Sequence, residues 1–177
     1  MLDPPNQKVG DIEEVTFDKK VLKEILEVGE GVKHPKRNFI AKINYKAYFY
    51  DHLEFDQGTE VSIALGDASW PEGLWLGIEK MRKNEVAKIK IKKKHGFGRK
   101  FQVEKLNFPK GYETEGKSRT RILTKGIIYE VKLLDWTQRV DIEADGNFLK
   151  EYLVKADKKD YEKPADRDEL ILDMTVT

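Results

Sequence analysis

The stretch Ser69-Trp70-Pro71-Glu72-Gly73-Leu74-Trp75-Leu76-Gly77-Ile78 decides the fold. It contains two of the three tryptophans, and a proline and two glycines restrict the backbone around them. Alternating apolar and polar residues predict a strand on each side, at Val61–Leu65 and Val86–Ile91. Because proline is tolerated in the first turn of a helix, we expect a helix that begins at Pro71 and ends at Asn84. An aromatic helix between two strands indicates the floor of a pocket.

Three further segments alternate as strands do: Val21–Leu26, Phe39–Tyr48 and Ile127–Leu133. Phe55-Asp56-Gln57-Gly58 is predicted to be a loop before the strand at Val61. The expected fold class is α+β, with a bent antiparallel sheet of about five strands wrapped around one short helix. The predicted inner faces carry Ala41, Ile43, Tyr45 and Ala47, then Ala87, Ile89 and Ile91, then Ile127, Tyr129, Val131 and Leu133.

The composition predicts a globular protein with a charged surface, since 39% of the residues are hydrophobic and 37% are charged. No apolar run approaches the roughly 18 residues that would span a bilayer, so we expect no membrane association. The first residues lack the pattern of a signal peptide, and the absence of cysteine excludes disulfides and thiolate chemistry. The expected compartment is the cytoplasm, with the nucleus as the alternative.

The formal net charge of +1 conceals two oppositely charged segments. Residues 79–100 are basic, and residues 141–173 are acidic. The basic segment could bind nucleic acid or an acidic partner. The alternative is that Lys88, Lys90 and Lys92 form the solvent face of a strand. Alternation explains these lysines completely, so we do not expect nucleic-acid binding.

The chain divides into three parts. Residues 1–17 are predicted to be a flexible N-terminal arm, and residues 18–136 a single domain with a long loop at 99–126. Residues 137–177 are predicted to be an acidic linker followed by the first strands of an incomplete second repeat. The repeat is expected because Phe148-Leu149-Lys150-Glu151-Tyr152-Leu153 reproduces the pattern of Val21–Leu26.

The sequence offers little conventional catalytic or metal-binding chemistry. Asp141–Gly146 begins like an EF-hand loop, but the twelfth position, which needs glutamate, is Tyr152. His34, His52 and His95 stand in separate loops without the spacing of metal ligands. No glycine loop for phosphates and no serine or cysteine nucleophile is present. We therefore expect no metal and no cofactor.

What remains is a set of aromatic residues that could line a pocket or simply fill a core. The set comprises Tyr45, Phe55, Trp70, Trp75, Phe97 and Tyr129. Spacing alone leaves both interpretations open, and it favours the core.

The order of short motifs along the chain resembles the macrolide-binding immunophilin (FKBP) family over about residues 18–136. The motifs are Gly29-Glu30-Gly31 with Pro35, Ile43-Asn44-Tyr45, Phe55-Asp56, Leu65-Gly66, Gly73-Leu74 with Gly77, Met81, Glu85, Gly96-Phe97-Gly98 and Tyr129-Glu130-Val131-Lys132-Leu133-Leu134. The resemblance implies the same fold, a bent sheet around one helix. The 148–177 repeat then resembles the start of a second such domain, as in multi-domain members.

The activity that the resemblance implies is peptidyl-prolyl cis–trans isomerisation (rotamase activity), which assists protein folding. An X–Pro amide rotates over a barrier of roughly 18–20 kcal/mol, in tens of seconds without catalysis. A dry aromatic pocket can favour the twisted amide, whose carbonyl is less polar, without any acid, base or nucleophile.

The resemblance also implies which residues form the pocket, and it exposes departures from the family pattern. Leu74 stands where working members have a tryptophan under the proline ring. Phe97 replaces a tyrosine donor, and Pro71 occupies the position of a backbone N–H donor although it has none. A fourth departure replaces an Ile-Pro-Pro-like segment by 121–126. The candidate pocket residues are Tyr45, Phe55, Asp56, Val61, Trp70, Pro71, Leu74, Phe97 and Tyr129.

These departures resemble the second, largely non-catalytic domain of large tandem immunophilins. We therefore expect a degenerate pocket with weak or no catalysis, in a domain that serves as a protein-interaction and co-chaperone module. The alternative is a fully active isomerase in which Trp70 or Trp75 supplies the missing aromatic surface. The expected partner is a proline-containing polypeptide or protein client. Binding to a chaperone would need TPR helices, of which these 177 residues show no pattern.

Overall fold

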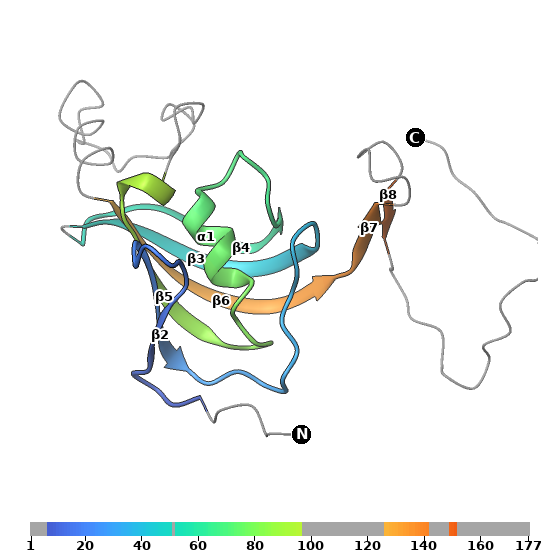
Figure 1. Cartoon of the computed structure of the whole chain (residues 1–177), viewed down its shortest axis with the longest axis horizontal. Helices are drawn as coiled ribbons and strands as arrows, with labels where there is room; N and C mark the ends of the chain where they lie inside the picture. The colour runs from blue at the N-terminus through green and yellow to red at the C-terminus, as the bar shows by residue number, and fades with distance from the viewer. Residues whose placement is uncertain (1–6, 51, 97–125, 142–148, 152–177) are drawn as a thin grey trace, which may run out of the picture.

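A computed structural model describes residues 7–50, 52–96, 126–141 and 149–151 (Figure 1). Six strands form one antiparallel sheet in the order β1-β2-β5-β6-β3-β4. The strands are β1 (Ile12–Glu14), β2 (Val21–Glu27), β3 (Ile40–Phe49), β4 (Glu54–Ala64), β5 (Val86–Ile91) and β6 (Ile127–Thr137). The helix α1 (Glu72–Ile78) lies across one face of this sheet. The α+β fold class predicted from the sequence is confirmed.

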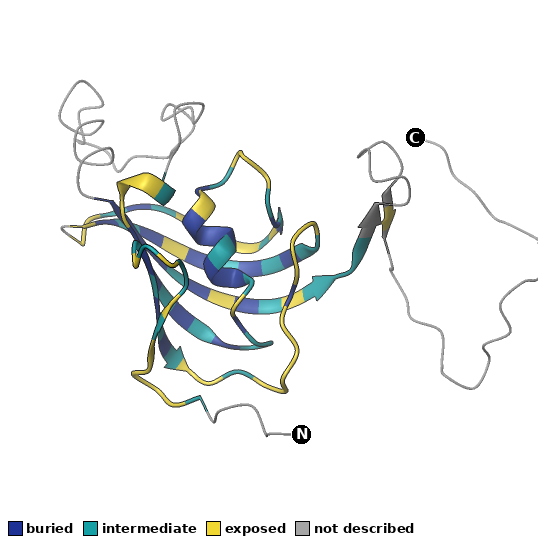
Figure 2. Cartoon of the chain, viewed as in Figure 1, coloured by how far each residue is buried: buried dark blue, intermediate teal, exposed yellow. Residues whose placement is uncertain are grey.

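The sheet forms because the alternating residues bury one face against α1. In β3, Ala41, Ile43 and Ala47 are fully buried, and the lysines between them are not (Figure 2). The same alternation in β5 and β6 buries the predicted inner residues. Register shifts within the β3–β4 and β3–β6 pairs mark bulges, which bend a sheet and increase its twist. This curvature wraps the sheet around the helix.

The helix rests unusually close to the sheet because two glycines face it. A Cβ added to Gly77 would lie 2.6 Å from Cδ1 of Ile89, and one added to Gly73 would lie 2.6 Å from Cγ2 of Ile91. No side chain fits into these gaps without a shift of the strand residues. Leu74, fully buried, fills the space beside them.

Two boundaries differ from the sequence prediction. The helix was expected to continue to Asn84, but it ends at Ile78, because Lys80 N–H bonds to Gly77 O and Met81 N–H to Ile78 O in a tighter turn. Met81 is still buried, as its place in the helical pattern indicated. The predicted loop at Phe55–Gly58 is wrong, since these residues belong to β4 and pair with β3. Glycine and aspartate are typical turn residues, so the sequence pattern did not indicate that this segment belongs to a strand.

The N-terminal part contributes a strand where the sequence showed no period. β1 pairs with β2, and Glu13 and the fully buried Lys23 form an ion pair of 3.1 Å. Lys23 also bonds to Lys80 O at 2.6 Å and to the buried Glu85 at 3.0 Å. Side chains alternate between the two faces of a strand, so Lys23 lies on the same face as Val21 and Ile25. The sequence pattern therefore indicated that this charged side chain is buried.

Two short strands lie beyond the end of β6. They are β7 (Arg139–Asp141) and β8 (Leu149–Glu151), which pair with each other (Figure 1). Most of the predicted repeat at 148–177, of the EF-hand-like stretch and of the loop at 99–126 lies outside the described residues. The three-part division of the chain therefore stays a prediction. Among the described residues, no helix is long and apolar enough to cross a membrane.

Candidate functional site

The inner face of the sheet carries a cluster of aromatic residues beside the start of α1. Tyr45 lies at its centre, on β3, and is 8% exposed. Its ring centroid is 5.6 Å from that of Trp70, with the rings at 88°, and 5.8 Å from that of Tyr129. Phe55 meets Tyr129 edge to face at 6.4 Å and stacks on Phe49 at 4.5 Å. Such edge-to-face and offset pairs stabilise a cluster beyond the area that they bury.

Hydrogen bonds at Asp56 orient the central ring of this cluster. The Tyr45 hydroxyl donates a hydrogen bond of 2.9 Å to Oδ2 of Asp56, while the Gln57 N–H donates to Oδ1. Burial, followed by the hydrogen bond and the charge of Asp56, raises the pKa of Tyr45 far above its usual value. Burial also raises the pKa of Tyr129 well above its usual value. Both phenols therefore stay protonated, and the Tyr45 hydroxyl keeps the hydrogen that it donates to Asp56.

A glycine opposite Tyr45 makes room for its ring. Gly58 in β4 pairs with Tyr45 across the sheet, and a Cβ there would lie 2.6 Å from Cε1 of Tyr45 and 2.7 Å from Cγ2 of Val61. Val61, half-buried, therefore lies beside the same gap. From the sequence, Gly58 was expected to have a turn or packing role. Its role depends on a cross-strand pairing that a single sequence does not reveal.

The start of α1 forms the side of the cluster nearest the helix. Pro71 is the residue before the first helical position, with φ −56°, and it is buried. It has no N–H to offer toward the cluster. Leu74, one turn further, is fully buried and presents only an aliphatic surface. Trp70 is half-buried, and its indole is the one that contacts Tyr45 among the described residues.

Ring contacts and a hydrogen bond join Tyr45, Phe55, Asp56, Trp70 and Tyr129. Val61 and Leu74 pack in the same core, and Pro71 follows Trp70. Their role as pocket residues stays a prediction. Phe97 lies outside the described residues. Trp75 belongs to the same hydrophobic core and is 7% exposed, and the Arg37 guanidinium carbon lies 5.2 Å from its ring centroid. That contact is a cation–π interaction.

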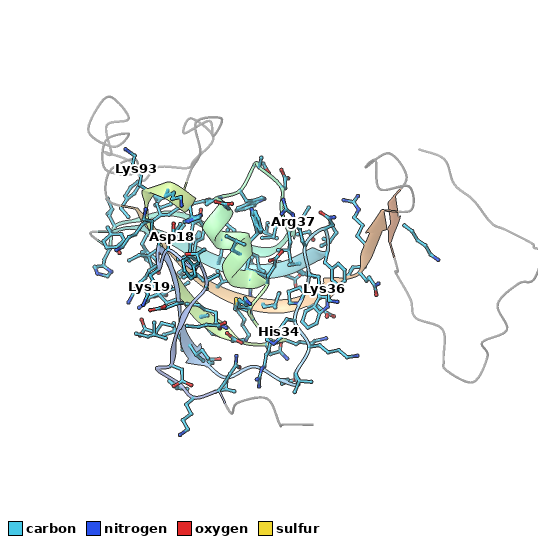
Figure 3. The ribbon with its side chains drawn as sticks, in the orientation of Figure 1. Asp18, Lys19, His34, Lys36, Arg37 and Lys93 are labelled. Atoms are coloured by element: carbon cyan, nitrogen blue, oxygen red, sulfur yellow. The ribbon has the colours of Figure 1, made fainter. Side chains whose placement is uncertain are left out.

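A large cleft lies at the opposite end of α1. It has a volume of about 820 Å³ and is lined by Gln7, Asp11, Ile12, Glu13, Ile25, His34, Pro35, Lys36, Arg37, Glu79, Lys80 and Arg82. None of the candidate pocket residues lines it. Figure 3 shows Arg37, at this cleft, on the opposite side of α1 from Asp18 and Lys93. Burial raises the pKa of Glu79 in its wall, against the charge of Arg37.

The chemistry of the aromatic cluster is that of a binding surface. It combines apolar rings, one bonded hydroxyl and one carboxylate, and its side chains include no hydroxyl activated by a base. Across the described residues, no three histidine, aspartate or glutamate side chains gather as metal ligands would. Tyr45, Phe55 and Tyr129 are at most 8% exposed, so the cluster is also part of the hydrophobic core.

Comparison with known proteins gives the family. The model of the FKBP-type peptidyl-prolyl cis-trans isomerase family matches residues 31–134, more than half of the chain. The chain belongs to this family. The match includes every described member of the aromatic cluster, from Tyr45 to Tyr129.

Solved structures of FKBP proteins share the fold at low sequence identity. The three FKBP domains of wheat FKBP73 superpose with a TM-score of 0.68 at 20% identity, covering 88% of this chain and 60% of that one. A multi-domain immunophilin from Arabidopsis thaliana gives 0.58 at 17%, covering 81% and 52%. FkpA from Escherichia coli gives 0.52 at 21%, covering 73% and 53%. The chain thus spans about half to three-fifths of the length of these proteins.

Proposed function

We propose that this FKBP-type domain binds proline-containing segments of other proteins and has weak or no isomerase activity. It would then serve as an interaction module, in the manner of a co-chaperone. The observation that carries the proposal is the construction of the helix start. Pro71 removes a backbone donor, and Leu74 puts an aliphatic side chain where the family resemblance implies an aromatic floor.

The residues that the sheet contributes to the cluster support the proposal that the domain binds a ligand. Tyr45, Asp56 and Tyr129 make the contacts described above, which supports a ring-lined site with a carboxylate at its edge. A proline ring is compact and apolar, and such a surface suits it. Each neutral hydrogen bond that is missing costs about 0.5–1.5 kcal/mol. Several missing contacts would reduce catalysis more than they reduce binding, because catalysis depends on contacts made to the twisted amide.

Trp70 supports a second candidate, a fully active prolyl isomerase that assists protein folding. Its indole lies against Tyr45 and could replace part of the floor lost at Leu74. Both candidates bind a proline-containing peptide, and only the second catalyses its isomerisation. They predict different effects of removing the indole on the isomerisation rate, since only the active enzyme would depend on it.

Binding is tested by titrating the isotopically labelled chain with a short X–Pro peptide and with the same peptide carrying alanine for proline. We expect the proline peptide to shift the NMR signals of Tyr45, Asp56 and Trp70, and the alanine peptide to leave them unchanged. Trp70→Ala should weaken binding severalfold, whereas Trp136→Ala, on a distant part of β6, serves as the matched control. Equal response to both peptides, or none at millimolar concentration, would exclude the proposed function.

A further inference from the structure

His95 lies between two carboxylates that come from distant parts of the chain. It ends the short 3-10 helix η1 (Lys93–His95) after β5. Its Nδ1 is 2.7 Å from Oε2 of Glu72, the first residue of α1. Its Nε2 is 3.1 Å from Oδ2 and 3.2 Å from Oδ1 of Asp18. With its side chain only 12% exposed, the imidazole joins α1, η1 and the turn before β2.

The turn that carries Asp18 is held from several sides. Lys94 Nζ donates to Oδ2 of Asp18 at 2.8 Å, and the Thr16 hydroxyl donates to Oδ1 at 2.8 Å. The hydrogen bond from Lys94, with those from His95 and Thr16, lowers the pKa of Asp18 well below its usual value. Asp18 therefore keeps its negative charge toward His95 over the whole range in which proteins are ordinarily studied.

The contacts of His95 require a particular protonation state. Carboxylate oxygens accept hydrogen bonds and do not donate them, so both ring nitrogens must donate. Only the imidazolium form carries a hydrogen on each nitrogen. The charged groups that face it are Asp18 from the turn and Glu72 from α1, and Lys94 of its own element bonds to Asp18. A neutral ring carries a hydrogen on one nitrogen only, so it can donate to one of the two carboxylates and not to both.

One of the segments that His95 joins carries candidate pocket positions. Glu72 directly follows Trp70 and Pro71. We propose that protonated His95 is a positioning residue, which ties the start of α1 to the end of β5 and so sets the affinity of the aromatic cluster for its ligand. This inference rests on the proposed function, and it makes ligand affinity depend on pH.

Three variants test the proposal with a short X–Pro peptide as the probe. We expect the wild-type affinity to fall about fivefold or more between about pH 5 and about pH 8.5. His95→Gln, which cannot donate from both sides, should show the weaker affinity at every pH. His95→Arg keeps a permanent charge with several donors and should bind tightly at every pH. His52→Gln removes an exposed histidine and should reproduce the wild-type profile.

A second measurement does not depend on the peptide. Nitrogen NMR of the His95 ring should show imidazolium at low pH, with hydrogen bonds from both nitrogens to Asp18 and Glu72, and the signals of Trp70 and Glu72 should shift when it deprotonates. A neutral ring at low pH, or unchanged Trp70 and Glu72 signals, would overturn the proposal. So would a flat affinity profile of the wild type, or a normal one in His95→Gln. If no variant binds the peptide at any pH while the ring signals behave as expected, the proposed function fails and the link between His95 and α1 stands.

Discussion

Tyr45 is the residue at which the polar and apolar contacts of the site meet. Its hydroxyl bonds to Asp56, and its ring contacts Trp70, Tyr129 and the space left open by Gly58. The chemistry of the site therefore depends on Tyr45, whose side chain is held by Asp56, Trp70 and Tyr129 and fits beside Gly58. A ring held in this way loses little freedom when a ligand binds, which favours affinity.

Tyr45→Phe tests the polar contact by itself. It keeps the ring and removes the hydrogen bond to Asp56, so we expect the free energy of unfolding to fall by about 0.5–1.5 kcal/mol. Urea denaturation measures the change. Tyr50→Phe, at an exposed position, is the matched control and should have no effect. An equal loss in both variants would show that the Tyr45–Asp56 bond adds no stability of its own.

The buried charge of Lys23 predicts a larger effect. Lys23→Ala leaves Glu85 charged and fully buried without its 3.0 Å partner, which should cost about 3–5 kcal/mol in unfolding free energy. The exposed pair of Lys42 and Glu60, 2.8 Å apart, is the control, and Lys42→Ala should cost about 0–1 kcal/mol. Thermal and urea unfolding of both variants give the comparison. Similar losses would contradict the assigned importance of burial.

At the scale of elements, the sequence predicted the strands best and the contacts between distant segments least. β3 and β5 alternate strictly and β6 does so after Ile128, so their inner residues could be named in advance. The end of α1 depends on a local tightening of the backbone after Ile78, which side-chain periodicity does not record. The contacts of His95 with Asp18 span 77 positions, and no local pattern indicates them. The positions of Tyr45 and Tyr129 on inner faces were predictable because both lie on alternating strands, whereas Phe55 was expected in a loop and Trp70 precedes the helix.

The contact of α1 with the sheet predicts a specific sensitivity at Gly77. Gly77→Ala puts a methyl group 2.6 Å from Ile89, so the helix or the strand must shift, at a cost of about 1–3 kcal/mol. Gly96→Ala, where the nearest atom would be 3.6 Å away, is the matched control and should be nearly neutral. Chemical denaturation reports both. Equal stability of the two variants would mean that the helix does not need this close approach.

The turn that carries Asp18 predicts a pH dependence of stability. The pKa of Asp18 in the folded chain lies below its ordinary value of 3.8, so its charge stabilises the fold above that pH. This contribution is lost as the pH falls through the folded-state pKa. Asp18→Asn should therefore be less stable than the wild type at neutral pH, and the difference should shrink in strong acid. Thermal unfolding across this range measures it, and a constant difference would contradict the assignment.

At the scale of the whole molecule, the two faces of the sheet serve different purposes. The face away from α1 carries pairs of opposite charge, Lys90 with Glu24 at 2.9 Å and Lys88 with Glu130 at 3.4 Å. These pairs support the interpretation of the strand lysines as a solvent face, and nucleic-acid binding remains unexpected. The inner face holds the helix and the aromatic cluster. The family membership fits this division, and the start of α1, with Pro71 and Leu74, is where we propose that the chain departs from a working isomerase.

The most direct test of that departure is the rate of X–Pro cis–trans exchange, measured by NMR on a short peptide with and without the chain. Pro71 and Leu74 predict a rate close to the uncatalysed one even where the peptide is bound, and little further change in Asp56→Ala or Trp70→Ala. Exchange far above the uncatalysed rate, abolished by Asp56→Ala, would contradict the account and establish the chain as an active prolyl isomerase.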